Sequence, residues 1–209
     1  MGSVGLLYVG AVLFVNAVMI LGRVDPRAAA IMNLFVGAMQ VVFPTILLTQ
    51  AGTDTAAISA AAGIYLFGFT YLYVGIGTLA NLDSTGVGWF SLFVSFSAIV
   101  FAAVNFFDVK DYPFGVIWLS WSFLWFLFFL LLGLKRSELN DYTGWVTLAN
   151  ALGTTTLPAF LLLTDNYSAA GKYAAIWAVC VVVIVVALWP LTRRMNTGTG
   201  APAEPATGP

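Results

Sequence analysis

Long apolar runs separated by short polar breaks make up most of the chain. A helix needs about 20 mostly apolar residues to cross the ~30 Å hydrocarbon core of a bilayer. The breaks, such as "AGTDTA" and "NLDSTG", contain the Asp, Gly and Pro residues typical of turns. We therefore expect an all-α integral membrane protein with seven transmembrane helices, at about 3–22, 28–50, 57–80, 87–107, 113–134, 143–163 and 171–191.

Composition supports this prediction and narrows the chemistry. Hydrophobic residues are 61% of the 209, charged residues only 8%, and mean hydropathy is +0.96, whereas soluble domains are about 25% charged. The chain has no histidine and one cysteine, Cys180, so it lacks the commonest metal ligand and cannot form an internal disulfide. We expect no metal and no cofactor. The net charge of -1 implies no attraction to nucleic acid.

The basic residues are distributed unequally between the two sides of the predicted topology. Lys110 and Lys172 fall on one side. Six fall on the other, namely Arg23, Arg27, Lys135, Arg136, Arg193 and Arg194. Because cytoplasmic loops carry an excess of Lys and Arg, we expect the N-terminus outside the cell membrane and the C-terminus in the cytoplasm. Residues 196–209 are rich in Gly, Pro, Thr and Ala and predict a disordered cytoplasmic tail.

Charged residues are absent from the interiors of all seven windows. Intramembrane charges mark ion pathways, proton relays and retinal counter-ions, so an ion-coupled pump is disfavoured. A retinal protein needs a lysine within its last helix, whereas Lys172 lies at the very start of the last window. An intramembrane enzyme is the least favoured class, because the windows hold neither a histidine nor a carboxylate. A purely structural bundle and a pathway for a neutral solute both remain.

Neutral polar residues are present inside the windows. They are Asn16, Asn33, Gln40, Thr70, Tyr71, Ser95, Ser120, Asn150 and Thr154. In lipid, such residues most often hydrogen-bond one helix to another. The same mixture of donors and acceptors would also replace the hydration of urea or a small amide. The residues alone do not decide between these roles.

Aromatic residues share faces on two of the predicted helices. At 100° per residue, Trp118, Trp121 and Trp125 fall within about 60° of arc. Phe67 and Tyr71 are four residues apart and also share a face. A buried indole N–H needs a partner, so the tryptophans are expected to face inward. They either pack the core or form a slot for flat molecules.

The last window differs from the others in having almost no polar side chain. Between Trp177 and Trp189, which fit the aromatic belts of membrane proteins, Cys180 is its only weakly polar group. We expect this helix to face lipid or a neighbour and to line no pathway.

A repeat links the first and third windows. "LYVGAVLFVN" at 7–16 and "LYVGIGTLAN" at 72–81 share the opening "LYVG" and the closing Asn. The segments "NLFVGA" at 33–38 and "SLFVSF" at 91–96 are also alike, and "TLANAL" at 147–152 gives a weaker third copy. We therefore expect three helical hairpins that cross the membrane in the same sense. This is a parallel repeat, unlike the inverted repeats of many transporters.

Five motifs together carry a resemblance to a known family. They are "LLYVGAVLFVN", "VDPRAAAIMNLFVG", "LFGFTYLYVG", "WFSLFV" and "IWLSWSFLWF". This combination, spread over about residues 1–163, resembles the AmiS/UreI family of urea and amide channels. The resemblance implies a six-helix protomer with its own pore, assembled as a homo-hexamer in the cytoplasmic membrane. It also implies passive movement of urea or short aliphatic amides toward a cytoplasmic urease or amidase.

Carried over motif by motif, the resemblance gives a set of pore residues. Phe67 and Tyr71 come from "FGFTYLY", and Trp121, Leu124 and Trp125 from "WLSWSFLW". Leu6 and Leu13 match pore-lining positions in the first helix. The aromatic members of this set are those whose shared faces follow from spacing alone.

Three departures from the family pattern affect the expected function. The loop after the second helix is only "AGTDTA", and without histidine the acid gating of the urea channels is not possible. Asn150 stands where those channels have a glutamate, which favours aliphatic amides over urea because an amide group both donates and accepts. The resemblance ends near residue 165, so the seventh helix is additional.

We therefore expect a channel domain at 1–165, an extra transmembrane helix at 166–195 and a tail at 196–209. The expected activity is that of an ungated, passive hexameric channel for small neutral amides, with urea as a second solute. Its pore-lining residues are expected to be Leu6, Leu13, Phe67, Tyr71, Trp121, Leu124, Trp125 and Asn150. The alternatives are a coupled secondary transporter of the same solutes and a non-transporting scaffold for an amidase.

Overall fold

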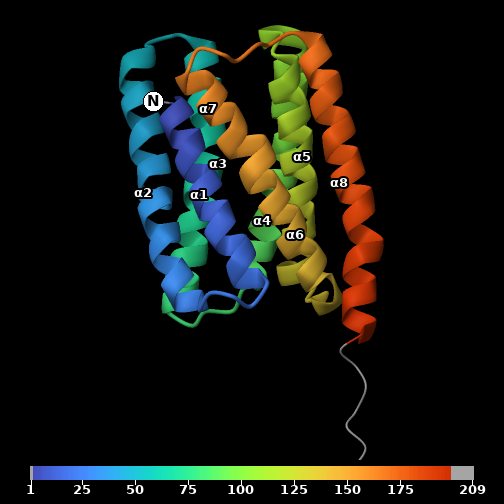
Figure 1. Cartoon of the computed structure of the whole chain (residues 1–209). Coiled ribbons are helices and arrows are strands. Elements are labelled where there is room, and N and C mark those ends of the chain that lie inside the picture. The colour runs from blue at the N-terminus through green and yellow to red at the C-terminus, as the bar shows by residue number, and fades with distance from the viewer. Residues whose placement is uncertain (1, 199–209) are drawn as a thin grey trace, which may run out of the picture.

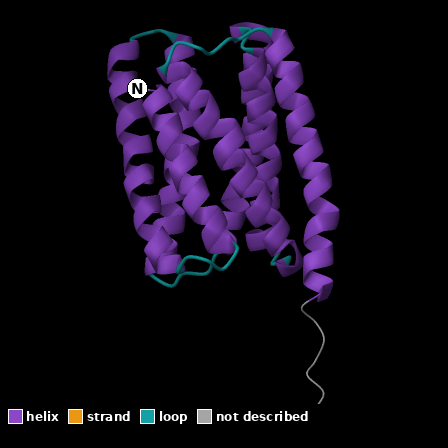
Figure 2. Cartoon of the chain, viewed as in Figure 1, coloured by secondary structure: helices purple, strands orange, loops and turns teal. Residues whose placement is uncertain are grey.

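The computed structural model describes residues 2–198, with side chains described through residue 192. Within that part of the chain all regular structure is helical (Figure 2). The α-helices are α1 (Gly2–Ile20), α2 (Pro26–Ala51), α3 (Thr55–Leu79), α4 (Thr85–Val104), α5 (Tyr112–Phe128), α6 (Asn140–Asn150), α7 (Leu157–Leu163) and α8 (Gly171–Gly198). Three π-helical segments, η1 (Asn105–Val109), η2 (Phe129–Gly133) and η4 (Ala151–Thr156), and a short 3-10 helix, η3 (Ser137–Leu139), extend or join them.

These elements form seven helices long and apolar enough to span a membrane, which confirms the expected seven-helix fold. The sixth span runs over Ser137–Leu163 and unites η3, α6, η4 and α7. It begins before the expected residue 143, because "SELND" forms the first turns of the helix instead of a loop. α8 continues to Gly198, so residues 196–198 belong to a helix and not to the expected tail. The rest of that expected tail lies outside the described residues.

The polar breaks start helices as well as separate them. Asp25 accepts a hydrogen bond from the backbone N–H of Arg27 at 2.8 Å and caps α2, whose first residue is Pro26. Asp54 caps α3 in the same way at 2.9 Å, and Asp111 caps α5. Because a capping carboxylate satisfies N–H groups that lack a partner inside the helix, these aspartates fix where the spans begin.

The first six spans close into a ring in which each packs against its neighbours in the sequence and the sixth packs against α1 (Figure 1). The most extensive contacts are between α2 and α3, between α4 and the fifth span (α5 and η2), and between α1 and the sixth span (α6 and η4). Each of these contacts joins the second helix of one hairpin to the first helix of another. The same relation occurs three times, as expected for three parallel hairpins.

Small residues explain why the paired helices approach so closely. A Cβ on Gly68 in α3 would lie 2.8 Å from the backbone oxygen of Gln40 in α2. A Cβ on Gly88 in α4 would lie 2.1 Å from the backbone nitrogen of Gly133 in η2. Glycine at such positions lets helix backbones meet in lipid, where packing drives association.

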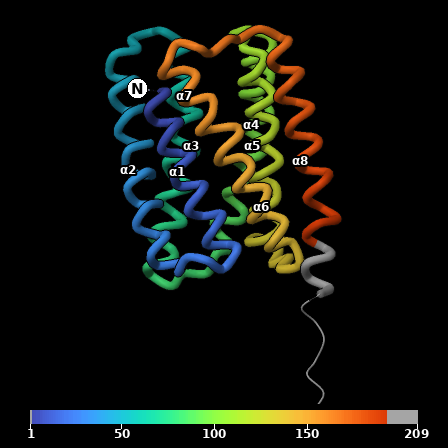
Figure 3. Tube along the Cα trace, in the orientation of Figure 1, coloured from blue at the N-terminus to red at the C-terminus, as the bar shows by residue number. Residues whose placement is uncertain are grey.

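α8 lies outside the ring, where it packs against α5 and α6 (Figure 3). Its most apolar 18-residue window contains no buried residue, as expected for a helix that faces lipid. One polar contact attaches it to the ring, because the Tyr142 hydroxyl of α6 donates to the backbone oxygen of Val185 at 3.0 Å. The ring of Tyr142 also packs edge-on against Trp189 at 5.1 Å between centroids. α8 thus contacts the bundle without entering it.

Candidate permeation site

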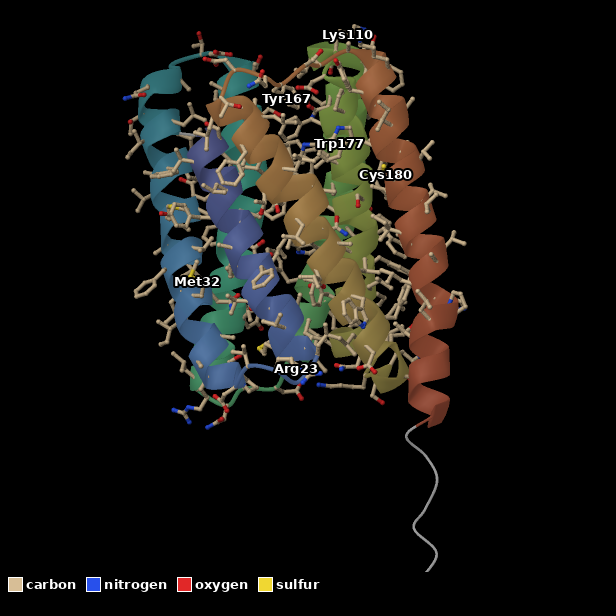
Figure 4. The ribbon with its side chains drawn as sticks, viewed as in Figure 1. Arg23, Met32, Lys110, Tyr167, Trp177 and Cys180 are labelled. Carbon is tan, nitrogen blue, oxygen red and sulfur yellow. The ribbon has the colours of Figure 1, made fainter. Side chains whose placement is uncertain are left out.

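Two cavities enter the ring of six spans from opposite ends. The N-side cavity, near the start of α1, has a volume of about 930 Å³. The C-side cavity, near the loops after α1 and α3, has a volume of about 530 Å³. Arg23 and Lys110 mark these opposite ends in Figure 4, with Lys110 at the N-side end. A solute that crosses the bundle between α1 and α5 would have to pass from one cavity to the other.

Aromatic side chains from α3 and α5 separate the two cavities. Phe67 and Trp121 line the N-side cavity, whereas Tyr71 and Trp125, each four residues further along, line the C-side cavity. The Phe67 ring lies 5.0 Å from both Trp121 and Trp125 between centroids, nearly edge-on to each. We call these four residues the aromatic constriction. Their shared faces, predicted from spacing, are confirmed by burial, since none of the four is more than 5% exposed.

Leucines from α1 complete the wall on either side of this constriction. Leu6 lines the N-side cavity and Leu13 the C-side cavity, two turns further into the membrane. Leu13 is 1% exposed. The helix register of α1 therefore places one expected pore residue on each side of the aromatic constriction.

Trp118 extends the aromatic wall toward the N-side cavity. It is buried and stacks on Phe101 of α4 at 4.8 Å with 24° between the ring planes. It therefore lies inside the bundle and does not belong to an interfacial belt of exposed tryptophans. Phe101 is a lining residue that the sequence did not single out, because nothing in its spacing distinguishes it from the other phenylalanines of α4.

Both tryptophans of the constriction have hydroxyl partners for their indole N–H groups. Trp121 Nε1 donates to Thr154 Oγ1 at 2.9 Å, and Trp125 Nε1 donates to Thr70 Oγ1 at 3.5 Å. Thr154 lies in η4, a π-helical segment in the middle of the sixth span. Such segments often occur at functional sites. Here the segment brings a hydroxyl to the indole that borders the constriction.

Two of the expected pore residues line neither cavity. Leu124 is completely buried in the hydrophobic core. The Asn150 amide oxygen accepts a hydrogen bond from Ser120 at 2.8 Å and lies 3.1 Å from Thr154 Oγ1. Its amide nitrogen donates to the backbone oxygen of Val146 at 3.0 Å. Asn150 therefore joins α6 to α5 and η4 behind the constriction, where it contacts Thr154.

The hydroxyl of Tyr71 is buried and has no hydrogen-bond partner within residues 2–192. An unsatisfied hydroxyl in an apolar setting costs free energy. Tyr71 lines the C-side cavity beside Trp125. The constriction thus combines apolar faces with one sealed hydroxyl that no described residue binds.

Charged side chains border the cavities but not the constriction. Asp108 lines the N-side cavity and Lys135 the C-side cavity. Lys135 Nζ lies 3.2 Å from Asp83 Oδ2 in the neighbouring loop. Hydrogen bonds from the side chain and backbone of Thr85, with a smaller contribution from Lys135, lower the pKa of Asp83 to about 2. The passage between the cavities therefore offers no fixed charge to an ion.

Two opposed cavities separated by an uncharged aromatic constriction, inside a closed ring of spans, are typical of a membrane transport protein for a small neutral solute. The comparisons agree with this class. The model of the AmiS/UreI family of transporters matches residues 1–166. The chain belongs to this family, whose members are transporters and channels and not enzymes.

Individual relatives support the assignment. A candidate transporter protein of Rhodococcus erythropolis, AmiS2, is 55% identical over 88% of this chain and 90% of its own length. A candidate amidate-substrate transporter of Mycolicibacterium smegmatis is 46% identical over 99% of this chain and 97% of its own. The acid-activated urea channel of Helicobacter pylori is 31% identical over 78% of this chain and 97% of its own.

The structure of the Helicobacter pylori urea channel in its closed state also matches this fold. It superposes with a TM-score of 0.73 and 31% identity, covering 80% of this chain and all of the other. The shared fold confirms the predicted channel bundle of the AmiS/UreI family.

Proposed function

We propose that the protein is a passive pore for small neutral amides, with urea as a second solute. The observation that carries this proposal is the uncharged aromatic constriction between the two cavities. Flat faces on Phe67, Trp121 and Trp125 fit a thin planar molecule and exclude a bulkier one. The Tyr71 hydroxyl, which is sealed and unpaired, would supply one hydrogen bond once a solute parts the aromatic side chains.

Short aliphatic amides are the favoured solutes because of the relatives' names. The relative named for amidate substrates and AmiS2 are 46% and 55% identical to this chain, against 31% for the urea channel. The preference for amides no longer rests on Asn150 as a pore-lining residue, because Asn150 lines neither cavity in this structure. It rests on the similarity to these relatives. Any influence of Asn150 on solute preference would act through Thr154 and Trp121.

The proposal extends to orientation and assembly. Six of the eight basic residues lie on the C-side, so the positive-inside rule places the C-side cavity in the cytoplasm and the N-terminus outside. We propose a homo-hexamer in which every protomer has its own pore. The solute would then be delivered to an amidase or urease in the cytoplasm.

A coupled secondary transporter of the same solutes is the second candidate. Coupling to ions or protons usually relies on an acidic, basic or histidine side chain in the pathway. The constriction contains none of these, which favours passive movement. A scaffold without transport is disfavoured, because a scaffold does not require two opposed cavities inside the ring of spans.

Solute flux into proteoliposomes tests the proposal directly. Stopped-flow light scattering would follow acetamide, urea and glycerol with and without a protonophore. We expect acetamide influx well above that of empty liposomes, slower glycerol influx, and no effect of the protonophore. Influx equal to that of empty liposomes for all three solutes would contradict a channel, and inhibition by the protonophore would indicate coupling.

A further inference from the structure

Gln40 of α2 is a buried polar residue at the inner end of the N-side cavity. Its side chain is only 3% exposed, yet it lines that cavity together with Phe67 and Trp121. The backbone of Gln40 packs against Gly68, the residue after Phe67. Gln40 therefore lines the same cavity as the N-side half of the aromatic constriction.

One hydrogen bond fixes how this amide is presented. Gln40 Nε2 donates to the backbone oxygen of Gly5 in α1 at 2.9 Å. A Cβ on Gly5 would lie 2.9 Å from the same nitrogen, so only a glycine allows the approach. With the nitrogen directed at α1, the amide orientation is set.

The amide oxygen of Gln40 is left without a partner. It forms no hydrogen bond to any described residue, and it is not among the sealed polar atoms, which are Tyr71 Oη and Thr143 Oγ1. A carbonyl oxygen in an apolar wall is costly unless something donates to it. Because this oxygen keeps access to the N-side cavity, the contents of that cavity can supply the donor.

The buried amide that lines the C-side cavity is bonded differently. Asn16 lines that cavity, but its amide pairs reciprocally with Asn33, at 2.9 Å and 2.6 Å. Its oxygen is therefore already engaged by the protein. Among the described residues, four amides line the cavities, namely Gln40, Asn105, Asn16 and Asn140. Asn105 and Asn140 are only partly buried, so Gln40 is the one buried amide of this set whose oxygen accepts no hydrogen bond from the protein.

We propose that Gln40 Oε1 accepts an N–H of the solute as the solute leaves the N-side cavity for the constriction. The ligand class is primary carboxamides and urea, which carry N–H donors. This inference rests on the proposed function and makes Gln40 a specificity-determining residue for it. The bond replaces a water that the amide nitrogen loses on the way to the aromatic faces.

Two substitutions at this position test the proposal in proteoliposomes with acetamide and urea. Gln40→Met keeps the length of the side chain but removes the acceptor, and we expect both influx rates to fall roughly tenfold. Gln40→Glu keeps an acceptor in both protonation states, but it keeps a donor to the Gly5 oxygen only while it is protonated, and its ionised form puts a charge into the apolar wall. Its influx is therefore expected to be greatest at low pH and to fall as pH rises, whereas wild-type influx stays constant.

Asn33→Leu is the matched control, because it removes a different α1–α2 hydrogen bond without touching the N-side cavity. We expect it to retain most of the influx. If the wild type conducts and Gln40→Met conducts equally fast, the role of Gln40 is overturned but the proposed function is not. Influx through Gln40→Glu that does not depend on pH would have the same meaning. Influx no faster than in empty liposomes for the wild type would overturn the proposed function and this inference together.

The Gln40→Glu measurement separates an effect of the ionised side chain from incomplete folding, and a second solute separates a solute contact from a structural role. The reversible pH dependence of Gln40→Glu is recorded within one preparation, so incomplete folding of the variant cannot produce it. A merely structural role of Gln40 would make Gln40→Met lower the influx of acetamide and of N,N-dimethylacetamide, which has no N–H to donate, by the same factor.

Discussion

The ring of six spans and α8 are all apolar helices of transmembrane length, but they differ in what they do with their polar groups. The ring buries many of its amides and hydroxyls beside the constriction or between helices. α8 is the most apolar span and contains no buried residue in its central window. Hydropathy alone therefore does not distinguish a transmembrane helix of the ring from α8. The few polar side chains of each helix, and the partners of those side chains, do.

The largest effect is expected from opening the constriction itself. Trp125→Ala removes a ring that is 1% exposed and contacts Phe67. We expect glycerol influx to rise toward that of acetamide, and the free energy of unfolding to fall by about 3–5 kcal/mol. Stopped-flow flux and thermal unfolding in detergent would measure both.

Trp177→Ala in α8 is the control for this change, since Trp177 is a half-buried tryptophan of α8 and lines neither cavity. It should leave the ratio of glycerol to acetamide influx as in the wild type. An equal loss of selectivity in both variants would show that the constriction does not select the solute.

A smaller effect is expected when the constriction is left intact but its support is altered. Thr154→Val keeps the shape of the side chain but removes the partner of Trp121 Nε1, which costs about 1–3 kcal/mol when the donor is buried. We expect a several-fold loss of selectivity between acetamide and glycerol. Thr154→Ser should restore selectivity, because it restores the hydroxyl. Equal selectivity for valine and serine would exclude a positioning role for Thr154.

Loosening α8 should affect stability more than transport. Tyr142→Phe removes the hydrogen bond to Val185 while keeping the ring contact with Trp189. We expect a stability loss of about 1 kcal/mol, seen as a lower Tm, with acetamide influx unchanged. A clear change in influx would mean that α8 is coupled to the pore.

The smallest effect is expected from pH. Since the pKa of Asp83 is lowered to about 2, its contribution to stability is present above its unfolded value of about 3.9 and is lost only as pH falls toward 2. Between pH 5.5 and 7.5 it stays ionised. Acetamide influx and Tm should therefore be nearly the same at these two values, for the wild type and for Asp83→Asn. A steep change of wild-type influx would indicate a gate.

The sequence by itself determined the spans, the hairpin repeat and the aromatic faces. Apolar length and capping aspartates set the helices, because a bilayer requires every backbone group to be bonded within its own span. Helical periodicity placed Phe67 with Tyr71 and Trp121 with Trp125 on common faces. The identities of the aromatic residues at the constriction followed from these local rules and from the family motifs.

Only the tertiary structure decided which polar side chains face a cavity and which bind a neighbouring helix. Asn150 and Gln40 are both buried amides in apolar windows, and periodicity could not separate them. Asn150 is engaged by Ser120 and Val146, whereas Gln40 has one bond and borders the N-side cavity. That difference depends on the rotation and spacing of neighbouring helices. These are set by packing between residues distant in sequence, such as Gly68 against Gln40, which no local pattern encodes.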